Sequence, residues 1–458
     1  MKPVFIIQNM LVKWLLCCLP ALCFSGCKKF LNKKPDRSLV LISSLDDIQK
    51  LIDKYDVMID GAVSGALEVI ADDYYLTDDV LGSLKQDMRN NYLWTADAQY
   101  PTCWNGTYVN SIYYANVILD QLPNIKIGSN ERTRCNELKG AALFFRAWAF
   151  YHLAQVYCAP YDAANLQKPG IVLKLSSAIL EKSKRSTVQQ TYDQIRNDLL
   201  EAAALLPEKD LYPTRPVKAA AFGALARMSL AMRDYADAGR YADSCLKRND
   251  QLMDYNELDS NAIPPFTRFN KETVFYSILS YEDPVTPDYM QVDSSLQRSY
   301  AGDDLRRGMY LSQRSDGTWK YDGTYEGGVF GQLFCGIATD EMYLVKAETE
   351  ARAGHVQESM NWLDRLLQYR WKKGQYQKQS VSTASDALAL VLAERRKELI
   401  FRGIRWTDLR RFNLEGNAIN LKRIYNGKEY TLGAGDPRWV LLIPDIVISL
   451  SGIDQNPR

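Results

Sequence analysis

This chain has few of the residues on which catalysis and metal binding usually depend. Its 458 residues include only two histidines, and the sequence contains no HExxH, GxSxG or phosphate-loop motif. His152 lies in a packed apolar segment and His355 follows Gly354 at a turn, so we expect a hydrogen-bonded helix-face residue and an exposed one. The sequence therefore predicts a protein that is not an enzyme, with no catalytic residues, no metal site and no cofactor.

The chain also has no excess of charge of either sign. It contains 56 Lys and Arg against 55 Asp and Glu, a formal net charge of +1. Lys2 and Lys13 are the only charged residues among residues 1–26, so the remainder carries 54 basic and 55 acidic side chains. A nucleic-acid-binding surface needs clustered Lys and Arg. We therefore predict no nucleic-acid partner.

Cysteines are few and widely spaced, and no CxxC pair occurs among the nine. The spacing excludes a zinc ribbon and a thioredoxin-like redox centre. An exported chain of this length has enough core to fold without disulfides. We expect mostly buried, small hydrophobic side chains with at most one disulfide among the five cysteines that follow residue 27: Cys103, Cys135, Cys158, Cys245 and Cys335.

The first 26 residues predict an export signal that ends at a lipid-modified cysteine. Trp14–Ser25 carries no charge and is too short to span a bilayer of about 30 Å. Cys27 directly follows a Ser-Gly pair, an order that resembles a bacterial lipobox, whose cysteine is acylated and becomes the new N-terminus. Several acyl chains anchor a protein stably, at about 0.8 kcal/mol per buried methylene. The alternatives are an uncleaved helix and a secreted protein with a chance cysteine.

Hydrophobic periodicity predicts a mainly α-helical fold. Helical patterns begin after a capping Ser44 and recur at about 104–121 and 131–157. Between Thr191 and Leu246 three further helices are expected, the second opened by Pro216. Small residues where these helices cross, and a second pair at about 339–369, are similar to tetratricopeptide repeats. Irregular spacing argues against a simple solenoid.

Residues of about 250–337 differ from the helical scaffold that we place at about 40–250 and 337–458. This stretch has many Pro, Gly and aromatic residues and only short β-like runs such as Thr273–Leu279. Tyrosine is frequent in the whole chain, with 28 Tyr against 14 Phe, and its polar tip suits wet grooves. We expect more than half of the tyrosines to pack between helices. The sequence predicts a loop-rich insertion, a kind of segment that often carries function.

Residues 394–411 read ERRKELIFRGIRWTDLRR, in which acidic and basic residues alternate at near-helical spacing and Gly403 separates two amphipathic halves. This run resembles the signature of the SusD/RagB family, roughly ERxxELxxEGxRxxDLxR. Arg402 stands where the family usually has glutamate. The ending, with Pro444 and a terminal Gln-Asn-Pro, resembles the family's last motif. We predict that the charges of the signature pair with one another and fix a helix and turn, rather than contact a ligand.

SusD/RagB proteins are surface lipoproteins of Bacteroidetes, and the resemblance implies a single mainly α domain over residues 27–458. In it, tetratricopeptide-like helix pairs support a variable loop-rich ligand face. The resemblance implies that the protein captures a nutrient, most simply an oligosaccharide, and delivers it to a SusC-like TonB-dependent transporter. It also implies a lipid anchor in the outer membrane, facing the cell exterior. The alternatives are a scaffold that gates the transporter without binding ligand and a peptide-capturing, RagB-like lid.

Ligand contacts are expected from aromatic rings that lie against the C–H faces of a sugar, with acidic and amide groups bonding its hydroxyls. The predicted ligand residues come from an Asp- and Tyr-rich loop after the first helix and from the insertion: Asp73, Tyr74, Tyr75, Trp319, Tyr321 and Tyr325. Trp94 is a weaker candidate, and Trp104 is expected in the core. The neighbouring pairs Asp72-Asp73 and Asp78-Asp79 suggest glycosidase acids or a calcium loop less well than they suggest solvated acids or helix caps.

Overall fold

Helices form about half of the structure and the strands are few and short, which confirms the predicted mainly α fold class. A computed structural model of the chain describes residues 42–60, 62–328 and 332–458, so the predicted signal and the lipid-modified Cys27 lie outside the described residues. Ser44–Arg458 forms one unit with its own core. The helices of its first half are α3 (Leu45–Ile52), α4 (Tyr55–Met58), α5 (Ala66–Val69), α6 (Asp78–Ser83), α7 (Gln86–Tyr92), α8 (Pro101–Thr107), α9 (Tyr113–Gln121), α10 (Arg132–Tyr157), α11 (Val188–Leu205), α12 (Lys218–Ala231) and α13 (Tyr235–Leu246).

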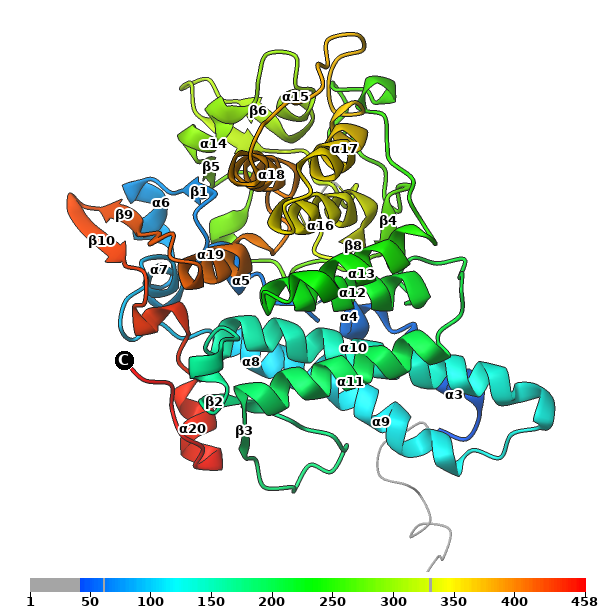
Figure 1. Ribbon diagram of the computed structural model, residues 1–458. Coiled ribbons are helices and arrows are strands. Elements are labelled where there is room, and N and C mark those ends of the chain that lie inside the picture. Colours follow the sequence, from blue (N-terminus) through cyan, green and yellow to red (C-terminus); the bar gives the residue numbers. More distant parts are fainter. Residues whose placement is uncertain (1–41, 61, 329–331) are drawn as a thin grey trace, which may run out of the picture. The chain divides into compact units, whose positions relative to one another are not determined.

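Helices that are neighbours in sequence pack in antiparallel pairs, and the pairs stack on one another (Figure 1). α10 packs against α11 and α12 against α13, and α13 also packs on α16. α16 in turn contacts α17 and α18. The predicted tetratricopeptide-like pairing is therefore present. The helices of the second half are α14 (Ser294–Ser299), α15 (Arg306–Tyr310), α16 (Thr339–Arg352), α17 (Val356–Leu367), α18 (Ala384–Glu398), α19 (Arg405–Leu414) and α20 (Asp445–Ser451).

Capping residues fix where the scaffold helices begin. In α11 the Gln190 N–H donates to Thr187 Oγ1 at 3.1 Å, and the Thr187 N–H donates to the Gln190 side chain at 3.0 Å. α12 begins at Lys218, two residues after the expected start at Pro216, because Val217 still has an extended backbone. Small residues permit the close crossings: a Cβ at Gly239 of α13 would lie only 2.8 Å from Thr349 Oγ1 of α16.

The helix expected over about 104–121 is interrupted. α8 passes into a π-helical segment, Tyr108–Ile112, before α9 begins. π-helical segments are rare and are often found at functional sites. The extra residue in each turn shifts the side chains that follow, and Val109 is left 65% exposed. The hydrophobic periodicity does not predict this interruption, because the spacing of apolar residues hardly differs between an α-helix and a short π-helical segment.

The cysteines and histidines are mostly buried. All five cysteines beyond Cys27 are free, and four of them are buried while Cys135 is half-buried, so no disulfide forms among the described residues. His355 is exposed as expected and bonds Glu350 at 2.8 Å. His152 is buried against Trp148, but neither of its ring nitrogens has a hydrogen-bond partner. The expectation of a hydrogen-bonded His152 was wrong, and burial lowers the pKa of this imidazole well below its usual value.

Short elements occupy the chain between Leu246 and Ile337. β5 pairs antiparallel with β1, so that Tyr75 lies opposite Gln291, and β6 pairs with β7 in a hairpin beside β5. Each of the sheets has two strands. The strands are β1 (Tyr74–Tyr75), β2 (Pro169–Val172), β3 (Arg185–Thr187), β4 (Thr273–Phe275), β5 (Gln291–Val292), β6 (Leu311–Gln313), β7 (Trp319–Tyr321), β8 (Ile337–Ala338), β9 (Leu421–Tyr425) and β10 (Lys428–Leu432).

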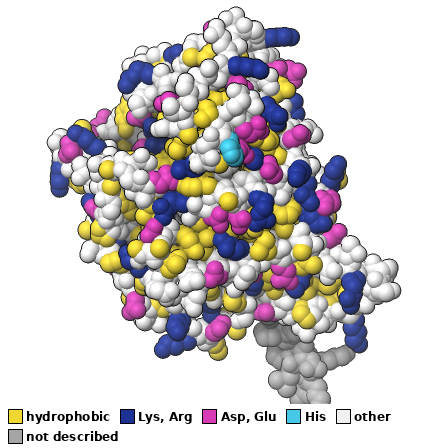
Figure 2. All heavy atoms as spheres, in the orientation of Figure 1, with side chains coloured by type: hydrophobic (Ala, Val, Ile, Leu, Met, Phe, Trp, Pro, Cys, Tyr) yellow, Lys and Arg dark blue, Asp and Glu magenta, His cyan; other side chains and the backbone are white. Residues whose placement is uncertain are grey.

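Charges of both signs are interspersed on the face shown in Figure 2, with no stretch of one sign. This distribution matches the near-zero net charge of the sequence. This face shows no continuous track of Lys and Arg.

Candidate functional site

The signature residues form two helices and the turn between them. α18 ends at Glu398 and α19 starts at Arg405. Gly403 in the turn has a φ of +69°, a conformation that side-chain-bearing residues rarely adopt. Its N–H donates to the Glu68 carboxylate of α5. The turn therefore ties the C-terminal helices to the N-terminal part of the chain.

Arg306 is the centre of the first charge cluster of the signature. Its guanidinium donates to both oxygens of Asp304, at 2.9 and 2.7 Å, and to Glu394 at 2.6 Å. It also reaches Glu398 at 3.1 Å, and Glu398 accepts a further bond of 2.7 Å from Arg370. These five side chains are buried. Each buried carboxylate is thus matched by an arginine, as burial of charge requires.

A second cluster joins α18 to α19 and α16. Asp408 accepts from Arg395 at 2.8 Å and from Arg411 at 2.9 Å, and Arg411 also binds Glu348 of α16. All four side chains are buried. The predicted pairing of signature charges with one another is confirmed for Asp408, whereas Glu398 binds Arg306 and Arg370, which lie outside the signature.

Arg402 shows how this chain accommodates its departure from the family signature. Its Nη2 lies 3.0 Å from Asp340, and its guanidinium lies 3.8 Å from the centre of the Tyr325 ring. Burial raises the pKa of Asp340 to about 7, while Arg402 opposes this rise. At the position where the family usually has glutamate, this chain therefore has a buried arginine that pairs with Asp340 of α16.

The acidic pair Asp72-Asp73 forms ion pairs with arginines of the signature. Asp72 binds Arg405 through both oxygens, at 2.7 and 2.9 Å, and Asp73 accepts from Arg396 at 2.8 Å. Burial raises the pKa of Asp73, whereas Arg405 holds the pKa of Asp72 below its usual value against the effect of burial. Neither carboxylate is a solvated acid, so that expectation was wrong for this pair.

The second acidic pair fits its expected role. Asp78 and Asp79 lie in the first turn of α6, where Thr77 caps the helix and negative charge is favoured.

Over the three described ranges of the chain, no group of three or more His, Cys, Asp or Glu side chains is placed to hold a metal ion.

Replacing Arg405 with alanine is expected to lower the free energy of unfolding by about 2 kcal/mol, since Asp72 would lose a bidentate charged partner. Chemical denaturation of the wild type and the variant measures this difference. Unchanged stability together with lost ligand binding would show that Arg405 is a ligand contact instead.

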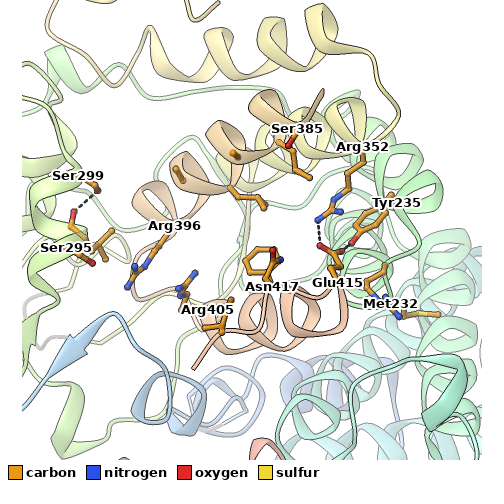
Figure 3. A pocket seen from close by; sticks show the side chains of 18 residues that line it. Met232, Tyr235, Ser295, Ser299, Arg352, Ser385, Arg396, Arg405, Glu415 and Asn417 are labelled. Atoms are coloured by element: carbon orange, nitrogen blue, oxygen red, sulfur yellow. Dashed lines mark hydrogen bonds and ion pairs between the residues drawn. The ribbon is translucent and has the colours of Figure 1, made fainter. Parts of the chain in front are cut away.

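A groove with a volume of about 1030 Å³ lies beside α18 (Figure 3). Leu388, Ala389 and Leu392 of α18 give it an apolar wall. Arginines line both ends, and each is paired: Arg352 with Glu415 at 2.9 Å and Arg405 with Asp72. The groove therefore offers an apolar surface and few free charges.

The structure separates the six predicted ligand residues into two groups. Tyr75 is 37% exposed and Trp319 is half-buried, whereas the other four are at most 3% exposed. Their polar groups bond within the protein. Tyr74 donates to Val69 O at 3.0 Å and Tyr325 donates to Glu272 at 2.6 Å. The buried residues are Asp73, Tyr74, Tyr321 and Tyr325.

The two tryptophans outside that set are also buried. Trp94 is buried and donates to Ile70 O at 2.9 Å, and Trp104 is in the core as expected.

Exposed aromatic side chains occur in β1, in β7 and in the segment that precedes β5. Tyr281 is 61% exposed and Tyr289 is 37% exposed, and both precede β5, which pairs with the strand of Tyr75. Trp319 lies in β7 beside β5, with the Arg307 guanidinium 4.7 Å from its ring centre. We call Tyr75, Tyr281, Tyr289 and Trp319 the aromatic face.

The turn that presents Tyr289 is held in place by Arg314. Its Nη2 donates to Pro287 O at 2.5 Å and to Met290 O at 2.8 Å. Tyr281 and Tyr289 lie within the predicted insertion but are not among the six predicted ligand residues. Their position beside Asp-Pro and Pro-Asp turns was the available signal, because turn residues are exposed more often than strand residues.

Comparisons with known proteins cover nearly all of this fold. A family model described as "Starch-binding associating with outer membrane" matches residues 29–230, and a model of the SusD family matches residues 339–438. No curated protein matches the chain. None of the helices in the described part of the chain is both long and apolar enough to cross a membrane.

Solved structures of SusD proteins share the fold at low identity. A SusD superfamily protein from Bacteroides thetaiotaomicron is 20% identical, with 91% of this chain and 100% of that chain covered at a TM-score of 0.73. One from Bacteroides vulgatus is 21% identical, covering 91% and 99% at 0.73. A laminarin-binding SusD-like protein is 16% identical, covering 90% and 97% at 0.62. With its two family-model matches, its signature and this fold, the chain belongs to the SusD/RagB family.

Proposed function

We propose that the protein captures an oligosaccharide on its aromatic face, without catalysis, and delivers it to a SusC-like TonB-dependent transporter. The observation that carries this proposal is the gathering of exposed rings on Tyr75, Tyr281, Tyr289 and Trp319. The family's description as starch-binding and associated with the outer membrane supports it. So does a SusD-like protein of the same fold that is described as laminarin-binding.

The chemistry of the aromatic face suits a sugar. The C–H faces of a pyranose lie against aromatic rings. Tyr75 and Trp319 lie in paired strands, so a sugar can contact these rings with little loss of side-chain entropy. Asp283 and Asp288 flank Tyr281 and Tyr289 and are exposed, so carboxylates are available to bond sugar hydroxyls. Of the six residues named from the sequence, the proposal keeps Tyr75 and Trp319 as ligand contacts. The four buried residues are not ligand contacts in this proposal.

The anchor in this proposal is the acylated Cys27. A chain held at the outer membrane and facing the exterior would meet its ligand beside the transporter. Cys27 lies outside the described residues, so this part of the proposal stands on the sequence pattern.

The double replacement of Tyr75 and Trp319 by alanine is expected to weaken glycan binding at least about tenfold, or ~1.4 kcal/mol. A glycan and peptide array on the chain without residues 1–27 first identifies the ligand, and isothermal titration then compares the variants. The fold should be unchanged, because neither side chain is part of the core.

Two controls locate the site. Tyr212→Ala removes a 49% exposed tyrosine from the helical scaffold and should leave affinity unchanged. Ala389→Trp obstructs the groove beside α18 and should also leave it unchanged. Loss of binding in the groove variant alone would move the site to the groove. Binding of peptides but no glycan on the array would favour the RagB-like alternative, and binding of neither would favour a gating scaffold.

A further inference from the structure

A second exposed apolar surface lies away from the aromatic face. It is formed by the π-helical segment before α9, by the loop that joins β2 to β3, and by α20. The exposed fractions of its side chains are 65% for Val109, 80% for Ile179, 99% for Leu180 and 81% for Leu450. Leu175 and Ile446 are 43% and 56% exposed. We call these six residues the aliphatic patch.

The three segments meet around one cavity of about 530 Å³. Val109 and Ile112 line it from the π-helical segment, Ile179 from the loop, and Val447 from α20. Figure 1 shows α20 and the β2–β3 loop projecting from the same end of the fold, near the C-terminus. The patch is therefore built from segments that are far apart in the sequence and that share this cavity. A monomeric protein rarely leaves such a contiguous apolar area in water without a use for it.

The loop is braced in a way that keeps its apolar tip exposed. The Ser177 N–H and Oγ donate to Asp120 at 2.8 and 2.7 Å. The Asn116 side chain donates to Lys174 O at 2.8 Å, and Lys174 Nζ donates to Glu181 O at 3.0 Å. These bonds fix the base of the loop on both sides of Ile179 and Leu180. The tip is thus presented by a defined structure.

α20 adds a helical part to the patch. Its sequence is DIVISLS, and none of its seven residues is buried. A helix this apolar normally packs one face on a core. Here the helix is held at its ends, where the Ile443 N–H donates to Gln455 Oε1 at 2.8 Å and Asn456 donates to Leu441 O at 2.7 Å.

The composition of the patch favours a lipid surface over a protein partner. Protein interfaces rely on Trp, Tyr and Arg at their centres, and Leu and Val are under-represented among their energetic hot spots. The most exposed side chains here are Leu and Ile. Lys182 and Lys184 follow the tip, are exposed, and make no ion pair in the part of the chain that the structure describes. Aliphatic tips with lysines at the rim are the pattern of interfacial membrane contact.

We propose that the aliphatic patch seats the folded unit on a lipid bilayer by inserting Ile179 and Leu180 at the level of the headgroups. The contact would add to the acyl anchor of the proposed function without requiring it. A membrane contact at this patch would fix which face of the protein is presented away from the bilayer.

Vesicle flotation tests the proposal on the chain without residues 1–27, which keeps the whole unit Ser44–Arg458. The wild-type chain is expected to float with vesicles of phosphatidylethanolamine and phosphatidylglycerol. The double variant Ile179→Ser and Leu180→Ser should bind at least about tenfold more weakly. Leu211→Ser, at an 80% exposed leucine of the helical scaffold, should float like the wild type. A wild-type chain that stays unbound would overturn the proposal and leave a protein partner as the occupant.

A fluorescent probe gives a second readout that does not depend on weakened binding. Among the five cysteines that follow residue 27, Cys135 is half-buried and the other four are buried. The double variant Cys135→Ser and Leu180→Cys therefore has one reactive thiol, at the tip of the loop. An environment-sensitive dye there should shift to the blue when vesicles are added. No shift, with vesicle binding intact, would place the contact elsewhere. Glycan affinity should not change in any of these variants, so the outcome is separate from that of the proposed capture function.

Discussion

Replacing Arg306 with alanine is expected to lower the free energy of unfolding by about 3–5 kcal/mol, the cost of breaking a buried ion pair. Arg306 is fully buried and binds Asp304, Glu394 and Glu398. Its removal leaves three carboxylates without their shared partner. Glu398 keeps Arg370, and the single ammonium group of Lys397 lies 2.5 Å from Glu394 and 3.9 Å from Asp304. Urea denaturation followed by circular dichroism measures the change, and a loss of soluble expression would be its most severe form.

Arg240→Ala is the matched control for this experiment. Arg240 pairs with Asp237 at 2.8 Å on the surface of α13, and its side chain is 60% exposed. Exposed pairs contribute little, so the control should change stability by less than about 0.5 kcal/mol. Arg306→Met distinguishes charge from volume, because methionine fills much of the space but removes the positive charge that the three acids share. If Arg306→Met were as stable as the wild type, the charge cluster would not hold the fold together.

Replacing Glu68 with glutamine is expected to flatten the pH dependence of stability. Burial raises the pKa of Glu68 to about 8 from an ordinary value of 4.5, the nearby Asp73 adds to the rise, and the Gly403 N–H opposes it. Between these values the folded protein keeps a proton that the unfolded chain has released. Raising the pH through this window therefore favours the unfolded chain. One such group lowers the free energy of unfolding by up to about 1.4 kcal/mol for each pH unit.

Denaturant midpoints at several pH values from about 5 to 8 measure this slope. Glu68→Gln does not titrate, so its stability should fall less steeply than that of the wild type. Glutamine keeps an oxygen that accepts from the Gly403 N–H, which limits other changes. Glu358→Gln, at an exposed position of α17, should leave the slope as it is. Parallel curves for the wild type and Glu68→Gln would mean that Glu68 is ionised in the folded protein.

Much of the scaffold could be predicted because its signals are local. Ser44 caps a helix where the sequence indicated a start, and Thr187 caps α11 four residues before the expected start at Thr191. The small residues of α12 and α13 predicted close crossings, and α13 does cross α16 closely at Gly239. Each of these features depends on residues within a few positions of one another. Hydrogen-bond capping and apolar spacing act at that range.

The ligand face was harder to predict because exposure in a loop depends on partners far away in the chain. Tyr74 and Tyr75 are neighbours, yet β1 pairing with β5 turns one ring inward and the other outward. Tyr325 lies in a loop, as expected, but its ring is buried because its hydroxyl donates to Glu272 and Arg402 stacks on its face. No local pattern distinguishes a ring that stacks on a distant arginine from one that faces water.

The sequence by itself determined the family, the mainly helical class, and the use of the signature charges as paired groups. These follow from residue types and spacings that act within one helix or turn. Only the tertiary structure decided which arginine serves which acid, which aromatic rings reach solvent, and that the β2–β3 loop and α20 meet in one aliphatic patch. Those outcomes depend on contacts between segments hundreds of residues apart, such as Arg405 with Asp72, and burial is settled only when such segments meet.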